Sequence, residues 1–201
     1  MRRETSSSTS RVGVVVPIRS FTDAKARLAE VLDPASRADL ARRMATRVLD
    51  AAGALPVIVV SSAPEVRAWA AARGVTVIDD PGGLDQAAAA GREACHALQY
   101  SRVVVAHADL PLARSLAPLA RDLGDDVVAL VPCHRDDGTN VLSLPVDAPF
   151  RFAYGPGSFR RHLDEARRLG MDVEVVRAPD LALDVDEPED LTHVDVRCTL
   201  P

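Results

Sequence analysis

The stretch Val12-Gly13-Val14-Val15-Val16-Pro17-Ile18 decides the fold class of this chain. Its apolar residues follow one another without polar alternation, which is typical of a strand buried on both faces of a parallel sheet. A helix is predicted at residues 34–52, because Asp33 suits the N-cap and Pro34 suits the first helical position. A shorter helix is expected between these two elements, at residues 24–32.

Strand-like and helix-like segments keep alternating along the rest of the chain. Further strands are predicted at residues 56–60, 75–78, 103–106, 127–131, 141–144 and 173–177. Further helices are predicted at residues 63–73, 85–99, 116–123 and 158–169. This alternation specifies an α/β fold with a mostly parallel sheet and helices on both faces. No internal repeat or flexible linker interrupts it, so residues 11–201 are predicted to form a single domain.

The composition of the chain limits which partners and which cell compartment are expected. The chain has 201 residues, of which 47% are hydrophobic and 26% charged, and a net charge of -5, which argues against nucleic acid as the main partner. Three widely spaced cysteines indicate a reducing compartment and no structural zinc. No apolar run is long enough for a membrane span. Residues 1–10 are polar and are predicted to be a disordered tail, not a signal peptide. We therefore expect a cytoplasmic globular protein.

An acidic stretch, Leu183-Asp184-Val185-Asp186-Glu187-Pro188-Glu189-Asp190-Leu191, lies near the C-terminus. If its apolar part is a strand, the carboxylates of Asp184 and Asp186 leave the same face. Pro188 and the acids after it are typical of the first turn of a helix. Paired carboxylates suit Mg²⁺ or Mn²⁺ together with substrate phosphates. The alternative is a solvated strand end whose acids cap the next helix.

In open α/β sheets, ligands bind beyond the carboxyl ends of the strands, so the loops there carry the chemistry. The first such loop has neither a dinucleotide-binding glycine motif nor a Walker lysine motif. It does carry Arg19, Lys25 and Arg27 near a predicted helix start, where cations suit a polyphosphate. A solvated basic helix face is the alternative.

The loop after the strand at residues 103–106 reads His107-Ala108-Asp109-Leu110-Pro111. Asp109 directly follows a buried strand, which places it well to meet the metal of a nucleotide, although it also suits a turn. For His107 we favour a core histidine with a satisfied ring over a catalytic role.

Two further loops are small, polar and rich in glycine. They contain Gly138-Thr139-Asn140 and Gly155-Pro156-Gly157-Ser158. Ser158 is predicted to be the N-cap of the helix that follows it. Because a helix N-terminus preceded by glycines is a ready anion site, Thr139 and Ser158 could together hold a small phosphate or carboxylate.

Six short motifs in this order resemble the 2-phospho-L-lactate guanylyltransferase family, whose members make the GDP-linked intermediate of the deazaflavin coenzyme F420. They are Pro-Ile-Arg-x5-Lys-x-Arg-Leu, Gly-Leu-Asp, Ala-Asp-Leu-Pro, Gly-Thr-Asn, Tyr-Gly-x-Gly-Ser-Phe and Asp-Val-Asp-x-Pro-Glu-Asp-Leu. The resemblance spans about residues 12–191. It implies a Rossmann-like nucleotidyltransferase of the glycosyltransferase-A type, with GTP and a small phosphorylated acid as its partners.

The resemblance also implies roles for particular residues. Asp109, Asp184 and Asp186 would hold Mg²⁺ or Mn²⁺. Arg19 and Lys25 would contact the GTP phosphates. Lys25, Asp109 and Asp186 would form the catalytic set. Asp85 would contact guanine or ribose, at a position where many members carry Asn. Thr139, Gly155 and Ser158 would bind the acid.

The chemistry fits a chain without a catalytic triad. A phosphomonoester is already an anionic nucleophile at pH 7, so positioning and charge neutralisation suffice. The acid could be 2-phospho-L-lactate, phosphoenolpyruvate or 3-phospho-D-glycerate. Two other readings are a related nucleotidyltransferase with another nucleotide or acceptor, and a non-catalytic nucleotide-binding module. The oligomeric state stays open, a homodimer included.

Overall fold

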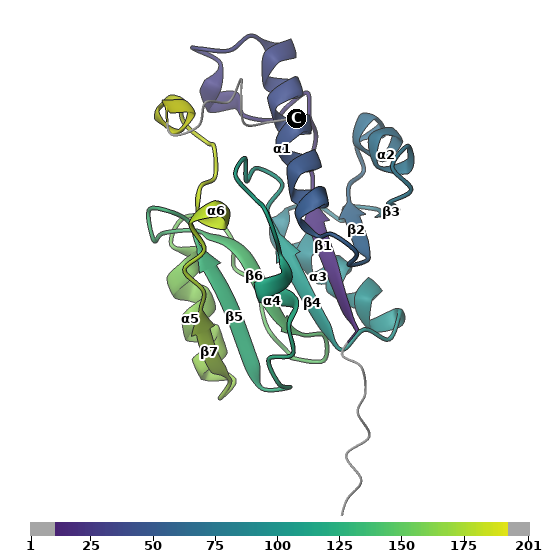
Figure 1. Cartoon of the computed structure of the whole chain (residues 1–201), viewed down its shortest axis with the longest axis vertical. Coiled ribbons are helices and arrows are strands. Elements are labelled where there is room, and N and C mark those ends of the chain that lie inside the picture. The colour runs from purple at the N-terminus through teal and green to yellow at the C-terminus, as the bar shows by residue number, and fades with distance from the viewer. Residues whose placement is uncertain (1–10, 193–201) are drawn as a thin grey trace, which may run out of the picture.

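The computed structural model describes residues 11–192. Seven strands form one sheet in the order β3-β2-β1-β4-β6-β5-β7, and Figure 1 shows helices on both of its faces. The strands are β1 (Val12–Pro17), β2 (Val57–Val60), β3 (Thr76–Ile78), β4 (Arg102–Ala106), β5 (Val127–Pro132), β6 (Thr139–Pro145) and β7 (Asp172–Val175). The helices are η1 (Ala26–Leu28), α1 (Pro34–Ala51), α2 (Pro64–Ala71), α3 (Leu84–Ala97), α4 (Ala117–Ala120), α5 (Ser158–Arg168), α6 (Pro179–Ala182) and η2 (Pro188–Thr192).

The sheet is parallel except at β6, which runs antiparallel to both of its neighbours, β4 and β5. The start of β6 therefore lies beside the ends of those neighbours, as the pairs Ala106↔Val141 and Pro132↔Thr139 show. The predicted fold class, a single-domain, mostly parallel α/β sheet with helices on both faces, is confirmed. In the described part of the chain, no helix is long and apolar enough for a membrane span.

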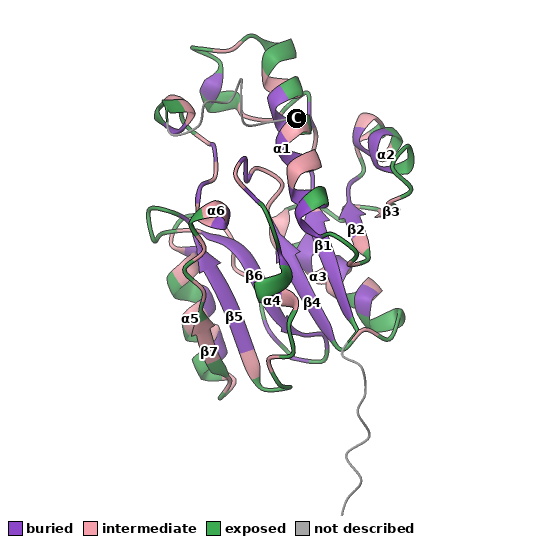
Figure 2. Cartoon of the chain, viewed as in Figure 1, coloured by how far each residue is buried: buried purple, intermediate pink, exposed green. Residues whose placement is uncertain are grey.

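The core has two layers, one on each face of the sheet. Val14 and Val16 of β1 pack with residues of α1, α2, α4 and α6 on one face. Val15, between them, packs with residues of α3 and α5 on the other. Figure 2 shows the resulting buried band along the central strands. The absence of polar alternation in β1 thus has the expected cause, burial on both faces.

A third, small cluster holds two segments in place: the loop after β1 that carries Arg19 and Lys25, here called the basic loop, and the acidic stretch at residues 183–191. Leu28 of η1 and Val185 of the acidic stretch are both fully buried against Leu40 and Met44 of α1. Burying a side chain of this size contributes about 1.5–3 kcal/mol relative to leaving it exposed. The basic loop and the acidic stretch are therefore held on the same helix.

The sequence prediction was wrong for the basic loop and for the first part of the acidic stretch, whereas the helix start expected at Pro188 is confirmed by η2. Instead of a helix at residues 24–32 there is only the single turn η1, and it is preceded by Lys25 in the left-handed region at φ 56°. The acidic stretch is not a strand. It runs from α6 through residues outside any sheet into the 3-10 helix η2. A short apolar run with few polar neighbours does not by itself distinguish a strand from a packed extended segment.

The start of α5 also differs from the prediction. Gly157, at φ 72°, is the N-cap, and Ser158 is the first helical residue. The predicted cap at Asp33 is confirmed, because its side chain accepts the backbone N–H of Ser36 at 2.8 Å. Residues 1–10, predicted to be a disordered tail, lie outside the described residues.

Candidate active site

A cavity of about 950 Å³ opens at the edge of the sheet where β1, β4 and β5 end. It is bounded by the basic loop, the acidic stretch and the start of α5. The charged, polar and glycine residues that line it and bear on the argument are Arg19, Lys25, His107, Asp109, Arg135, Asp137, Gly155, Ser158, Asp184, Asp186 and Glu187. Most of the residues predicted for the site therefore meet here. The exceptions are Thr139 and Asp85, which do not line the cavity.

Lys25 joins two carboxylates from different parts of the chain. Its Nζ lies 2.6 Å from Asp109 Oδ2 and 2.9 Å from Asp186 Oδ1. Burial alone would lower the pKa of this ammonium, but the two carboxylates together raise it above its ordinary value. The lysine is therefore charged at neutral pH and acts as a cation placed between two acids.

The pKa values of the two less exposed acids, Asp109 and Asp184, shift in opposite directions for different reasons. For Asp109, burial favours a raised pKa, but attraction from Lys25 and His107 and the hydrogen bond from Lys25 bring the pKa below its usual value. For Asp184, burial and repulsion from Asp109 and Asp186 raise the pKa. The third acid, Asp186, is the most exposed of the three. The cluster therefore holds more negative charge than the one lysine compensates.

Two oxygens of this cluster have unused hydrogen-bonding capacity. In the described part of the chain, Asp109 Oδ1 and Asp184 Oδ1 are buried without a hydrogen-bond partner. Buried polar atoms normally have partners, so each such atom calls for an explanation. Among residues 11–192, no three His, Cys, Asp or Glu side chains form a ready metal-binding group. Each of the two oxygens has a long contact to a histidine: Asp184 Oδ1 lies 3.5 Å from Nδ1 of His134, and Asp109 Oδ1 lies 3.9 Å from Nδ1 of His107. Carboxylate oxygens without a hydrogen bond, beside a third acid, fit a divalent cation with oxygen ligands.

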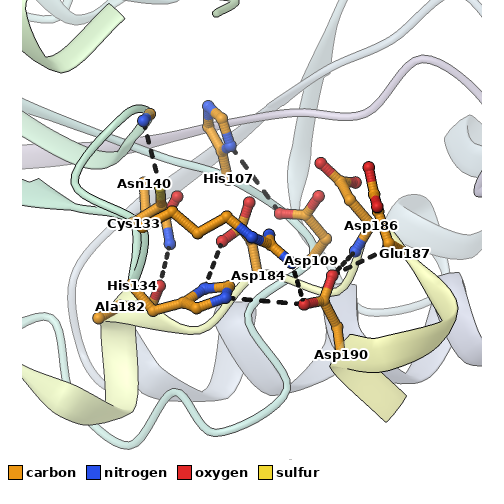
Figure 3. A network of polar contacts seen from close by, with 12 residues as sticks. His107, Asp109, Cys133, His134, Asn140, Ala182, Asp184, Asp186, Glu187 and Asp190 are labelled. Carbon is orange, nitrogen blue, oxygen red and sulfur yellow. Dashed lines mark hydrogen bonds and ion pairs between the residues drawn. The ribbon is translucent and has the colours of Figure 1, made fainter. Parts of the chain in front are cut away.

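The backbone of the acidic stretch is held by Asp190, which is fully buried (Figure 3). Its Oδ2 accepts the backbone N–H groups of Asp186 at 2.9 Å and Glu187 at 2.8 Å. Its Oδ1 accepts Nη2 of Arg135 at 2.6 Å. Burial would raise the pKa of Asp190, but these hydrogen bonds and the charge of Arg135 lower it.

The opposite wall is the glycine loop before α5. Gly155 and Gly157 both have positive φ, 97° and 72°, which glycine adopts without strain. The hydroxyl of Ser158 accepts the backbone N–H of Thr139 at 3.1 Å. The side chain of Asp137 accepts the backbone N–H of Gly157 at 2.9 Å. The loop is thus tied to the turn between β5 and β6.

Thr139 and Asp85 already have partners behind the cavity wall. The hydroxyl of Thr139 lies 2.9 Å from Nδ1 of His162, and its side chain is fully buried. Asp85 Oδ1 accepts the backbone N–H of Tyr154 at 2.7 Å. The predicted substrate contacts of these two residues stay predictions.

The sequence reasoning missed three contributors to the site. His107 was expected to have a satisfied ring, but its Nε2 is buried without a hydrogen-bond partner and its ring lines the cavity. Arg135 and Asp137 were assigned no role. The signal available for them was the charged run His134-Arg135-Asp136-Asp137 directly before a glycine-rich strand start.

The overall fold of this chain recurs in a solved structure. A proposed nucleotide-diphospho-sugar transferase from Desulfovibrio desulfuricans G20 has the same fold, with a TM-score of 0.73 at 18% sequence identity, over 90% of this chain and 85% of that one. Residues 12–197 match the family described as "Guanylyl transferase CofC like". The chain belongs to this family, and it is a nucleotidyltransferase.

Two relatives cover nearly the whole chain. A phosphoenolpyruvate guanylyltransferase from Rubrobacter xylanophilus is 37% identical over 92% of this chain and 93% of its own length. A 3-phospho-D-glycerate guanylyltransferase from Phenylobacterium zucineum is 37% identical over 90% of this chain and 88% of its own. The resemblance derived from the six motifs is confirmed at the level of the family.

Proposed function

We propose that this protein transfers GMP from GTP to the phosphate of a small phosphorylated carboxylic acid and releases pyrophosphate. The observation that carries the proposal is the meeting of Lys25 with Asp109, Asp184 and Asp186 on one side of the cavity that the glycine loop closes on the other. The acidic side suits a metal-bound triphosphate, and the glycine side suits a small anion.

The acidic side would hold Mg²⁺ or Mn²⁺ through Asp109, Asp184 and Asp186. When bound, a divalent cation neutralises charge on the triphosphate and stabilises the departing pyrophosphate. Lys25 adds a positive charge at the same place, and Arg19 adds another at the cavity wall. Both cations favour GTP phosphates over uncharged ligands.

The reaction needs no protein nucleophile. An oxygen of the acceptor phosphate forms the new bond to the α-phosphorus of GTP, and the bond from that phosphorus to the bridging oxygen of the β-phosphate breaks. The acceptor phosphate already carries the negative charge required, because its second pKa is near 6. The role of the protein is to bring the two phosphates into line and to neutralise their repulsion.

The glycine loop and the start of α5 would bind the acceptor. Gly155 and Gly157 have no side chains, so an anion can approach the backbone there, and their positive φ values are ones that glycine adopts without strain. The hydroxyl of Ser158 lines the cavity, and its oxygen is fixed by the N–H of Thr139. A three-carbon acid bearing a phosphate, such as phosphoenolpyruvate, 3-phospho-D-glycerate or 2-phospho-L-lactate, presents suitable groups. The product would serve the synthesis of the deazaflavin coenzyme F420.

Incubation of the protein with GTP, Mg²⁺ and each of the three acids in turn tests the proposal. We expect a product in which a diphosphate links guanosine to the acid, called the diester below, together with one equivalent of pyrophosphate. It should form with at least one acid and be identified by mass. The same incubations with ATP and CTP test the choice of base, and an Asp186→Asn protein controls for contaminating activity. No diester from any acid would refute the proposed function.

A further inference from the structure

The turn between β5 and β6 makes one contact whose purpose the chemistry above does not explain. Arg135, on this turn, donates Nη2 to Oδ1 of Asp190 at 2.6 Å. The two residues lie 55 positions apart, and the side chain of Asp190 has no exposed surface. A half-exposed arginine of the turn is thus paired with a fully buried acid of η2.

Asp190 is connected through its other oxygen to the backbone that carries Asp186. That oxygen accepts the N–H groups of Asp186 and Glu187, so Asp190 bonds three donors in all. The hydrogen bond from the N–H of Asp186 to Asp190 fixes the backbone of Asp186, from which the Asp186 side chain projects. Because the carboxylate of Asp186 extends only one methylene beyond that backbone, its place is fixed with it.

Part of this arrangement is ordinary helix capping. Asp190 is the third residue of η2, and a side chain at that position commonly bonds back to the N–H group before the helix. Capping alone accounts for the bond to Glu187. Capping does not account for the hydrogen bond from Asp186, nor for the hydrogen bond from Arg135, which lies on the turn between β5 and β6.

We infer that Asp190 and Arg135 are positioning residues that hold the carboxylate of Asp186 beside Lys25 and Asp109. The inference rests on the proposed function, in which Asp186 binds the divalent cation. Arg135 acts through Asp190: its hydrogen bond to Oδ1 keeps the buried carboxylate oriented with Oδ2 toward the two N–H groups. Partners of this kind, one step removed from a metal ligand, typically contribute 10–100-fold to metal affinity or activity.

The same turn offers a matched control. Arg177 pairs with Asp136, the residue next to Arg135, but both members of that pair are more than half exposed. An exposed ion pair of this kind contributes little to the stability of the fold. The pair also includes no residue of the acidic stretch. Arg135→Ala removes an arginine of the turn, and Arg177→Ala removes an arginine after β7 that pairs with the turn. Only the first removes a partner of Asp190.

Hydrogen–deuterium exchange of the full chain without ligands is the first measurement. In Arg135→Ala we expect faster exchange at the amides of Asp186 and Glu187, with β1 unchanged. Arg177→Ala is expected to leave the acidic stretch at its wild-type rate. Equal rates in wild type and Arg135→Ala overturn the inference, as does an equal acceleration by Arg177→Ala.

Mn²⁺ binding, followed by electron paramagnetic resonance of the free ion, is the second measurement. We expect about 10–100-fold weaker binding in Arg135→Ala, partial recovery in Arg135→Lys, and no further loss when Arg135→Ala is added to Asp190→Asn. In turnover, kcat should fall with KM for the acid nearly unchanged. Unaltered Mn²⁺ affinity in a folded Arg135→Ala protein overturns the inference.

These readouts separate the inference from the proposed function. If the wild type forms no diester while Arg135→Ala still accelerates exchange at Asp186, the function is wrong and the positioning role stands. If the wild type is an active guanylyltransferase and Arg135→Ala matches it in exchange and Mn²⁺ binding, the positioning role is wrong and the function stands.

Discussion

The ammonium of Lys25 lies 2.6 Å from Oδ2 of Asp109, although the two residues are 84 positions apart in the sequence. This contact joins the loop after β1 to the loop after β4. These two strands are neighbours in the sheet, so the ends of both arrive at the same edge. The expected effects of replacing Asp186 and Lys25 both depend on this meeting of cation and acids.

Activity is expected to require a divalent cation, and Asp186→Asn should lower kcat about a hundredfold or more, the scale of losing one electrostatic stabiliser. The physical reason is the excess negative charge of Asp109, Asp184 and Asp186 over Lys25 alone. Turnover measured with Mg²⁺, Mn²⁺ and EDTA checks the prediction. Full activity in EDTA, or a near-wild-type Asp186→Asn enzyme, would contradict it.

Lys25→Ala should weaken GTP binding and lower the melting temperature at neutral pH. Without the ammonium, the carboxylates repel one another with nothing between them, and added Mg²⁺ should restore part of the lost stability by binding the folded state. Lys25→Gly is the matched variant, because alanine keeps the left-handed backbone strain that lysine has at φ 56°, whereas glycine relieves it. Isothermal titration with GTP decides the matter. Early melting with normal GTP affinity would make the lysine purely structural.

Ser158→Ala should raise KM for the acid, leave KM for GTP nearly unchanged, and lower the free energy of unfolding by about 1–3 kcal/mol. The stability cost arises because the N–H of Thr139 loses its acceptor in a buried place. Ser143→Ala is the control, since Ser143 is equally buried and hydrogen-bonded but lies away from the cavity. A Ser158→Ala protein that loses stability without any change in KM would remove Ser158 from the acid site.

The free energy of unfolding should fall as the pH drops from about 6.5 toward 4. Burial and the nearby charge of Arg161 lower the pKa of His162 to about 4, whereas an unfolded histidine binds its proton near pH 6.5. The contribution of His162 is therefore complete above pH 6.5 and is lost on acidification, with a slope approaching about 1.4 kcal/mol per pH unit.

Urea unfolding at a series of pH values measures that slope in the wild type, His162→Gln and His96→Gln. His162→Gln should show a shallower slope, although its overall stability is lower because His162 bonds Thr139 and the N–H of Ala153. His96 is mostly exposed, and His96→Gln is the control for replacing a histidine at the surface. Identical slopes in all three proteins would show that His162 titrates normally.

Local signals were enough for much of the fold. The unbroken apolar run of β1 indicated burial on both faces, and Asp33 with Pro34 marked the start of α1, because a strand's burial pattern and a helix cap are written in neighbouring residues. The three acids and Lys25 were also named from the sequence, from their places in loops after apolar segments and from the resemblance to the family. Their roles in metal and phosphate binding stay predictions.

The sequence by itself determined the alternation of strands and helices, the family and the residue types of the site. Only the tertiary structure decided how those residues meet. The turn at Lys25, the course of the acidic stretch and the contact between Arg135 and Asp190 depend on packing between segments far apart in the chain. Leu28 and Val185, for example, take their places because both bury against α1. No local pattern encodes such contacts, because each is stable only when the rest of the fold has brought its partner near.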